Sequence, residues 1–376
     1  MISDTFHDEL GPEKILEVYD ARTGMHGFVV IDNTALGPGK GGIRMTPTVS
    51  KEEVFRLSRA MTYKCSLAGL PFGGAKSGII ANPKEITPEH KKAIVKAFAK
   101  ALNPVSPSQY VAAPDISMAE EEMRIYAKTN GDMKSCTGKP ADMGGIPHEF
   151  GSTGFGVYHA TLVAVKHLGL DIKKLSFAIE GFGNVGWFAA KYLTEAGAKL
   201  VAASDSQGTL YNPVGVDFEK LAKVKKEQRT VTKYKGGKTC SVLMGEEIVS
   251  VPVDILITAA IPDLVTDANK DKIRAKIIIE GSNIPMSPEV EDYLHEKGVL
   301  VIPDFVANAG GVISSYVEYM GGSKEDMFRM VEEKIVKNTK EVLEKAKKAR
   351  IKPRDAALKI ALERIHKAME KRDKEK

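Results

Sequence analysis

The chain has 376 residues and a mass of 40.8 kDa, so two domains that share an interface are expected rather than one. Its composition, 43% hydrophobic and 27% charged, excludes a disordered, collagen-like or disulfide-stapled protein. The net charge of +5 is concentrated near the C-terminus, where residues 323–376 hold 18 Lys+Arg against 11 Asp+Glu. This mixture of signs is typical of a solvated helix face, so we expect no nucleic-acid partner.

The cysteine and histidine patterns bound the chemistry further. Cys65, Cys136 and Cys240 form no Cys-x-x-Cys pair, which predicts neither a disulfide framework nor a structural zinc site and fits a reducing compartment. The eight histidines form no HxxxH or HExxH pair, so we expect no metal site. No apolar run reaches the roughly 18 residues needed to span a bilayer, and the start resembles no signal peptide. We predict a cytoplasmic protein with no membrane partner.

Two glycine-rich segments in the first third of the chain each carry one lysine. GPGKGGIR at 37–44 holds Lys40, and GLPFGGAKSG at 69–78 holds Lys76. Glycines provide little bulk to shield these side chains. A helix is predicted between the two segments, and Lys64 lies at the edge of its apolar stripe.

Two interpretations of these lysines stay open. In the first interpretation, these lysines have no function in binding or catalysis: Lys40 and Lys76 are exposed, and Lys64 extends past an apolar surface to water. Alternatively, the three form a cluster for an anionic substrate, in which repulsion and desolvation lower the pKa of one amine and make it a base near neutral pH. The helix between the glycine segments is predicted to begin at a capping box, Ser50 with Glu53.

One acidic residue stands out downstream. VAAPDIS at 111–117 places Asp115 after Pro114, at the end of a run of small residues. Such a residue can simply cap a turn or a helix. A carboxylic acid near a lysine of lowered pKa would instead provide the proton donor that amine and carbonyl chemistry requires.

After about residue 150 the pattern changes to short apolar runs, each followed by a helical pattern, as in buried parallel strands. The runs are LSFAIE (175–180), KLVAAS (199–204), VDILITAA (253–260), KIIIEG (276–281) and VLVIPD (299–304). Their ends are rich in polar or small residues, with Asn283 after the fourth and Asn308 after the fifth. Ligands bind at such carboxyl ends, which makes this edge a candidate site.

The motif GFGNVG at 181–186 lies between the first run and a helical pattern. Gly181 permits a tight turn, Gly183 lets the backbone approach a pyrophosphate, and Gly186 allows close helix packing, while the helix N-terminus supplies N–H groups. The alternative is a glycine turn that serves packing alone. The residues predicted here to bind a dinucleotide are Gly181, Gly183, Asn184, Val185 and Gly186.

The second run is followed by Asp205, where an acidic group can bond a ribose hydroxyl. The neighbouring Ser204, Ser206 and Gly208 would leave room for a 2′-phosphate, so NAD and NADP both stay open. Helical spacing from about residue 323 is interrupted at Pro353, which predicts a break or kink there.

The fold class that follows is α/β with two domains. We expect an N-terminal α/β domain at 1–148, joined by C-terminal helices at 335–376, and a doubly wound Rossmann-type dinucleotide-binding domain at 149–334.

The chain resembles the glutamate/leucine/phenylalanine/valine dehydrogenase family from about residue 15 to 330. The motifs that carry the resemblance, in matching order, are GPGKGGIR, MTYKCSLAGLPFGGAKSG, APDIS, TGKP, GFGNVG, SDSQG, EGSN and PDFVANAGGV. The resemblance implies a first domain that binds the amino acid and makes oligomer contacts, and a cofactor domain that closes onto it. It implies NAD(P)-dependent oxidative deamination of an amino acid, with a hexamer favoured as the homo-oligomer.

The resemblance also assigns roles to residues. Lys76 matches the catalytic lysine, Asp115 the catalytic aspartate, and Lys64 the lysine that holds the substrate α-carboxylate. Lys40 and Ser315 match residues that hold the side-chain carboxylate in glutamate enzymes, where leucine-type enzymes carry an apolar residue at the position of Lys40. Three further positions line the substrate pocket or the nicotinamide side of the cleft: Thr153, Asn308 and Val312.

The lysine at position 40 favours glutamate, because burying a second substrate carboxylate without a cation would be strongly unfavourable. Two alternatives remain: a leucine, valine or phenylalanine type of dehydrogenase, and a catalytically silent nucleotide-binding homologue with a regulatory role. The chain departs from the family's usual pattern in two places. It has no glycine-serine-x-glycine-arginine stretch after TGKP, and it reads EGSNIPMSP instead of EGANGPTTP.

Overall fold

The fold is taken from a computed structural model that describes residues 7–375. The chain divides into two units. Unit 1 holds the described residues up to Phe150, Val312–Met327 and the chain from Leu358 on; unit 2 holds Gly151–Gly311 and Phe328–Ala357. No helix among residues 7–375 is both long and apolar enough to cross a membrane.

Unit 1 is built on a five-stranded sheet in the order β1-β2-β4-β3-β5. β1 and β2 pair antiparallel, as do β2 and β4, while β3 runs parallel to both β4 and β5. The strands are β1 (Lys14–Asp20), β2 (Met25–Asn33), β3 (Gly39–Thr46), β4 (Gly73–Ile80) and β5 (Tyr110–Pro114). The helices that begin in this part of the chain are α1 (Lys51–Leu67), α2 (Pro88–Ala101) and α3 (Glu120–Asn130).

The sheet of unit 1 has a core on each face, because successive residues of β2 point to opposite faces and the residues from Phe28 to Ile31 are all apolar. One core joins β2 and β3 side chains such as Val29 and Ile43 to Phe98 of α2 and Tyr126 of α3. A smaller one gathers Phe28 and Val30 of β2 against Val54 of α1. The strands that carry the glycine-rich segments are therefore fixed from both sides.

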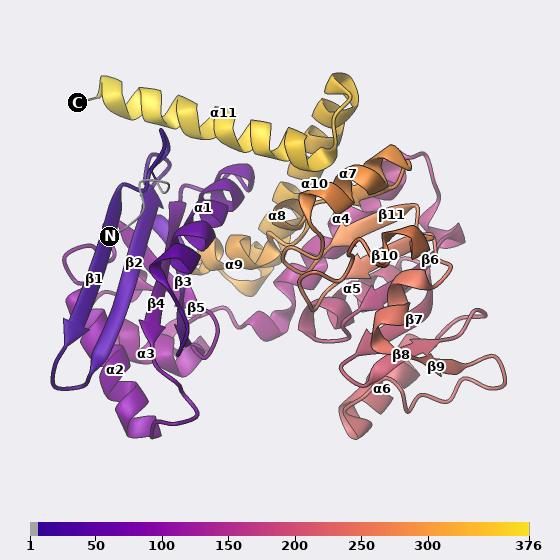
Figure 1. Cartoon of the computed structure of the whole chain (residues 1–376), viewed down its shortest axis with the longest axis horizontal. Coiled ribbons are helices and arrows are strands. Elements are labelled where there is room, and N and C mark those ends of the chain that lie inside the picture. Colours follow the sequence, from indigo (N-terminus) through magenta and orange to yellow (C-terminus); the bar gives the residue numbers. More distant parts are fainter. Residues whose placement is uncertain (1–6, 376) are drawn as a thin grey trace. The chain divides into compact units, whose positions relative to one another are not determined.

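Unit 2 contains a seven-stranded sheet in the order β12-β11-β10-β6-β7-β8-β9 (Figure 1). The strands from β12 to β7 are parallel, and β8 and β9 extend the sheet antiparallel. The strands are β6 (Ser176–Glu180), β7 (Lys199–Asp205), β8 (Gly208–Tyr211), β9 (Ser241–Leu243), β10 (Ile255–Thr258), β11 (Ile277–Glu280) and β12 (Leu300–Ile302). This order confirms the doubly wound α/β fold, and the five predicted apolar runs hold β6, β7, β10, β11 and β12.

Five α-helices of unit 2 lie between residues 152 and 307, one before β6 and the others between or after the strands. They are α4 (Ser152–His167), α5 (Asn184–Glu195), α6 (Phe218–Gln228), α7 (Pro288–Glu296) and α8 (Asp304–Ala307). A core cluster packs α7, through Val290 and Leu294, against Leu256 of β10 and Ile278 of β11. The order of the strands reverses between β6 and β10, so the edge where those two strands end is the switch point at which such sheets bind ligands.

Three C-terminal helices complete the fold: α9 (Gly310–Tyr319), α10 (Lys324–Ala349) and α11 (Pro353–Lys374). The predicted break at Pro353 is confirmed, because α10 ends before it and α11 begins at it. The division of this region differs from the predicted one, since most of α9 groups with unit 1 and most of α10 with unit 2. The start of α11 also groups with unit 2, where Lys352 pairs with Asp292 and Arg354 pairs with Glu280.

Candidate functional site

Lys76 and Asp115 form an ion pair in unit 1. Lys76 lies on β4 and Asp115 directly follows β5, with β3 between these two strands. The pair meets across Gly42 of β3, where a Cβ atom would come within 2.8 Å of the Asp115 Cβ and 3.4 Å of the Lys76 Nζ. The glycines of GPGKGGIR therefore clear the space in which the two charged groups touch.

Burial shifts the proton equilibria of this pair. Lys76 is only 8% exposed, and burial lowers the pKa of its ammonium despite the opposing field of Asp115. Burial alone would raise the pKa of the Asp115 carboxyl, but the charges of Lys76 and Arg44 outweigh it and the net shift is downward. Both groups thus move toward a deprotonated state, which suits Lys76 as a base near neutral pH.

Arg44 is a neighbour that the sequence reasoning did not select. Its Nε lies 3.3 Å from the Asp115 Oδ2, and its Nη1 bonds Glu53. Glu53 was predicted to close a capping box; Ser50 does accept from the Glu53 N–H, but the Glu53 carboxylate holds Arg44. The position of Arg44, four residues after Lys40 on the same strand, was the signal that could have found it.

Lys40 is the most deeply buried of the three predicted lysines, with 1% exposure. Its Nζ donates a 2.8 Å hydrogen bond to the Ala112 carbonyl, and burial lowers the pKa of its ammonium to about 8. Lys64 lies half-buried in the last turn of α1. Burial raises the pKa of the Cys65 thiol, and the charges of Lys40 and Lys64 partly oppose this shift. Both lysines therefore lie near Cys65.

Helix α9 carries Val312, which is buried, and Ser315, which is half-buried. The helix is anchored beside β4, since Phe72, next to the start of that strand, packs edge-on against Tyr316 and Tyr319 with ring centroids 5.7 and 5.1 Å apart. Six residues predicted to bind the substrate or to catalyse its reaction lie in unit 1. They are Lys40, Lys64, Lys76, Asp115, Val312 and Ser315.

Glu318, also on α9, is a second residue that the sequence did not reveal. Its buried carboxylate accepts hydrogen bonds from the backbone N–H groups of Gly138, Lys139 and Ile146 at 3.0 to 3.2 Å. It also pairs with the Lys139 ammonium at 2.6 Å. Glu318 therefore fixes the loop that follows the TGKP motif, although 172 to 180 residues separate the partners.

In unit 2, the GFGNVG turn has the shape that a dinucleotide needs. Gly181 has φ +85°, and a Cβ there would come within 2.4 Å of the Ala260 Cβ. A Cβ at Gly186 would lie 2.1 Å from the Gly181 carbonyl oxygen, whereas one at Gly183 would meet no atom within 4 Å. Gly183 is the N-cap of α5 and provides no side-chain cap. Two glycines are required by packing, and the third opens the helix N-terminus to a pyrophosphate, so the residues fit the cofactor.

The Asp205 carboxylate is held by its own chain. It accepts hydrogen bonds from the Lys225 ammonium at 2.6 Å, the Val231 N–H at 2.8 Å and the Gln207 N–H at 2.9 Å. Burial raises the pKa of the Asp205 carboxyl, but its hydrogen bonds and the charge of Lys225 lower it by more, so the net shift is downward. The structure thus gives Asp205 a role in shaping the 229–232 turn, and its bond to a ribose stays a prediction.

Side chains at the carboxyl edge of the sheet connect neighbouring loops. The Asn308 amide donates to the Asn283 Oδ1 at 2.9 Å, which joins the loops after β12 and β11. Thr153 lies in the first turn of α4, and a Cβ at Gly311 would approach its Oγ1 to 3.1 Å. Thr153 and Asn308, predicted to line the cleft, and Asn283, predicted to bind the cofactor, are all in unit 2.

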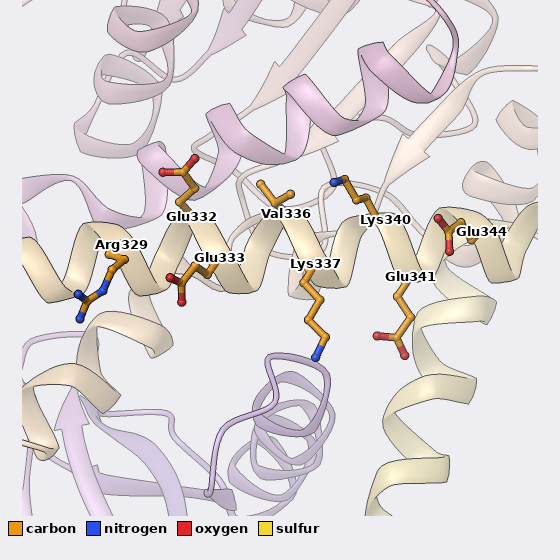
Figure 2. Close-up of a pocket in the computed structure, with 8 residues that line it drawn as sticks. All are labelled: Arg329, Glu332, Glu333, Val336, Lys337, Lys340, Glu341 and Glu344. Atoms are coloured by element: carbon orange, nitrogen blue, oxygen red, sulfur yellow. The ribbon is translucent and has the colours of Figure 1, made fainter.

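Two other features lie apart from these residues. A cavity of about 700 Å³ runs along α10 (Figure 2), where acidic and basic side chains are mixed from Arg329 to Glu344 and favour no single sign of ligand charge. The ligand atoms of Glu120, His148 and Glu149 lie within 4.8 Å of one another, with His148 and Glu149 exposed. Exposed acidic groups often lie this close without a metal ion. That the protein binds no metal therefore stays a prediction.

Comparison with known proteins identifies the family. The family model described as Glutamate/Leucine/Phenylalanine/Valine dehydrogenase matches residues 144–373, which is more than half of the chain. A second model, Glu/Leu/Phe/Val dehydrogenase, dimerisation domain, matches residues 12–131. The chain belongs to this family.

Two similar proteins are named glutamate dehydrogenases. The glutamate dehydrogenase of Aeropyrum pernix is 43% identical over 358 residues, which cover 90% of this chain and 85% of that protein. The NADP-specific glutamate dehydrogenase of Saccharolobus shibatae is 34% identical over 391 residues, covering 98% and 92%. Among solved structures, the hetero-hexameric glutamate dehydrogenase of Thermus thermophilus in its Leu-bound form has a TM-score of 0.84 at 27% identity, covering 96% of this chain and 90% of that one.

Proposed function

We propose that this Glu/Leu/Phe/Val dehydrogenase catalyses the reversible oxidative deamination of L-glutamate to 2-oxoglutarate and ammonia with NAD or NADP. The observation that carries the proposal is the buried Lys40 ammonium in the same unit as the Lys76–Asp115 pair. The names of the relatives, glutamate dehydrogenases at 34 to 43% identity, support it.

Charge decides the substrate. The Lys40 ammonium is buried against a carbonyl oxygen, and among residues 7–375 it has no carboxylate partner. A buried cation of this kind is unfavourable unless an anion joins it. We propose that the substrate γ-carboxylate is this anion, with Ser315 as a second partner. Lys64 holds the α-carboxylate, and Val312 packs against the aliphatic part of the substrate.

Lys76 and Asp115 handle the protons. With its pKa lowered by burial, Lys76 reaches the neutral amine more easily than an exposed lysine does and can activate a water molecule against the imino carbon. The water oxygen bonds to that carbon, the carbon–nitrogen bond breaks, and Asp115 carries a proton to the departing ammonia. The dinucleotide, when bound, accepts the hydride from the substrate α-carbon, or supplies it in the reverse direction.

Unit 2 is the proposed binding site of the dinucleotide. The pyrophosphate binds at Gly181, Gly183, Asn184, Val185 and Gly186, where the open N-terminus of α5 offers N–H groups and a positive dipole end. Asp205 shapes the ribose side, and Asn283 together with Thr153 and Asn308 lies at the nicotinamide side. The buried free thiols of Cys65 and Cys136 support a reducing, cytoplasmic location. We also propose a homo-oligomer, a hexamer by family resemblance, which light scattering of the purified protein tests.

The experiment is an assay at 340 nm with ammonium, NADH or NADPH, and one oxo-acid at a time. We expect turnover with 2-oxoglutarate and little or none with 2-oxoisocaproate, 2-oxoisovalerate or phenylpyruvate. The pair of cofactors shows the NAD or NADP preference in the same run. Turnover with an apolar oxo-acid only would contradict the role of Lys40. Binding of nucleotide without any turnover would replace the proposal with the regulatory alternative.

A further inference from the structure

Ile284, in the loop after β11, has an unusual backbone conformation. Its φ is +49°, in the left-handed region that branched side chains rarely adopt because the second branch at Cβ crowds the backbone. Its side chain is 58% exposed, so burial in the core does not offset this strain. An exposed apolar side chain on a strained backbone calls for another physical reason.

The surrounding chain imposes the conformation through both backbone groups of Ile284. Its N–H donates to the Asp304 Oδ2 at 3.0 Å, and its carbonyl accepts from the Asp263 N–H at 3.0 Å. Asp304 is in turn held by the Arg354 Nη1 at 3.0 Å. Strain of this kind persists where several contacts determine one geometry, and it concentrates at sites that bind or react.

A second exposed isoleucine lies on the adjacent loop. Ile261 is 51% exposed and follows β10, the strand that pairs with β11. Its N–H points to the Glu180 carboxylate, which also accepts from the N–H groups of Ala259 and Ala260. The bond between Asp263 and Ile284 joins the two loops. Two large apolar side chains are thus presented at the carboxyl edge, beside Asn283 and next to the switch point.

We propose that Ile284 and Ile261 form an apolar clasp that packs against the bound nicotinamide dinucleotide. Ligand sites combine apolar walls with a few polar groups, and here Asn283 supplies the polar group next to Ile284. Contact with the cofactor removes the two exposed side chains from water, which favours binding. The inference rests on the proposed dinucleotide function of unit 2.

The test compares three variants in binding experiments that need no turnover. Ile284→Ala removes the side chain beyond Cβ, and Ile284→Gly also relieves the left-handed strain. Val214→Ala is the matched control, because Val214 is 67% exposed but lies away from the proposed site. It follows β8, which runs antiparallel to β7 and so ends at the edge of the sheet opposite the carboxyl ends of the parallel strands. Dissociation constants for NADH and NADPH come from calorimetry, supported by quenching of the single tryptophan, Trp187. Thermal unfolding gives Tm.

We expect both Ile284 variants to bind the preferred dinucleotide about tenfold more weakly, since contacts of a few methyl and methylene groups are lost. Ile284→Gly should keep a Tm at or above that of Ile284→Ala, and Val214→Ala should leave the affinity unchanged. Unchanged affinity in both Ile284 variants would overturn the inference. If the variants also changed the size of the oligomer, Ile284 would instead belong to a subunit interface. A wild-type protein that binds neither dinucleotide would overturn the proposed function as well, which separates the two failures.

Discussion

The two units differ in the charge that they bury near their candidate sites. In unit 1 the strands of the candidate site bury the cations Lys40 and Lys76, and the buried Lys139 is paired with the carboxylate of Glu318. In unit 2 the buried groups at the ends of strands are the carboxylates Glu180 on β6 and Glu280 on β11. The lysines of unit 1 are carried by strands or by a loop that Glu318 fixes, and the carboxylates of unit 2 accept backbone N–H groups of the loops that follow the strands.

This difference in buried charge means that the candidate substrate site and the candidate cofactor site are built from different kinds of groups. In unit 1 the proposed substrate site consists of charged side chains whose positions are set by the sheet. In unit 2 the charged side chains mainly shape loops, and the proposed cofactor site consists of glycines, backbone N–H groups and a few exposed side chains. Substitutions in unit 1 should therefore change chemistry directly, and most substitutions of the buried carboxylate network in unit 2 should change stability first.

The largest effect is expected for the Lys76 amine. Lys76→Met removes the proposed base while keeping a similar chain length, and kcat should fall by about 10³-fold, within the range of a general base. The same assay as above measures it, with Lys84→Met, an exposed lysine of unit 1, as the control. Near-normal turnover by a folded Lys76→Met protein would contradict the mechanism.

Arg354 should show the contrasting behaviour of unit 2. It pairs with Glu280, Glu291 and Asp304, so Arg354→Met leaves buried carboxylates without a cation and should lower the free energy of unfolding by about 3 to 5 kcal/mol. Denaturant unfolding measures the loss, and Arg274→Met, an exposed arginine of unit 2, is the control.

The loss at Arg354 should depend on pH. Burial raises the pKa of Glu280 well above its usual range, against the opposing charge of Arg354. A raised pKa means that the folded protein binds a proton more tightly than the unfolded chain, so the contribution to stability grows as pH falls. The deficit of Arg354→Met relative to wild type should therefore shrink toward pH 5. A deficit that grows with acidity would show that the carboxylates are stabilised by other groups.

Lys40 sharpens the comparison through pH. The pKa of its ammonium is about 8, so the cation that would pair with the γ-carboxylate is lost as pH rises through that value. We expect kcat/KM for 2-oxoglutarate to fall above pH 8. In Lys40→Leu, kcat/KM should be lower by about 10²-fold, since one partner of a buried charge pair is missing, and should lack this pH step. A wild-type profile that is flat between pH 7 and 9 would contradict the assignment.

The smallest effect is expected at Asp205. Asp205→Asn weakens the bonds to Lys225 and Val231, and it should cost about 1 kcal/mol of stability, the scale of a single partly exposed interaction. Because the carboxylate is engaged by its own chain, we expect the affinities for NADH and NADPH to change by the same factor. A selective loss of NADH binding would show instead that Asp205 reaches the ribose, as the sequence alone predicts.

Local patterns in the sequence predicted much of the architecture. The apolar runs of unit 2 became β6, β7, β10, β11 and β12, because buried parallel strands need continuous apolar residues. Proline at 353 broke the helix through its missing N–H group. The antiparallel strands β8 and β9 were not predicted, since β9 is a short edge strand with little apolar pattern.

Side-chain partners far apart in the sequence were beyond such patterns. Nothing near Glu318 indicates that it binds the loop after TGKP, and nothing near Arg354 indicates Glu280. Glu53 fitted a capping box by spacing, but Arg44 was closer to its carboxylate in space. The left-handed backbone of Ile284 was likewise invisible, because a branched residue predicts the opposite conformation.

The sequence by itself determined the family and the two-domain α/β fold class, and it predicted the residues of the substrate and cofactor sites, because these depend on motifs read over a few neighbouring residues. Only the tertiary structure decided that Gly42 lets Lys76 meet Asp115, that Lys40 is buried against a carbonyl oxygen, and that Asp205 serves a turn. Burial and the distances between charges set pKa values and partners, and both arise only when segments distant along the chain pack together.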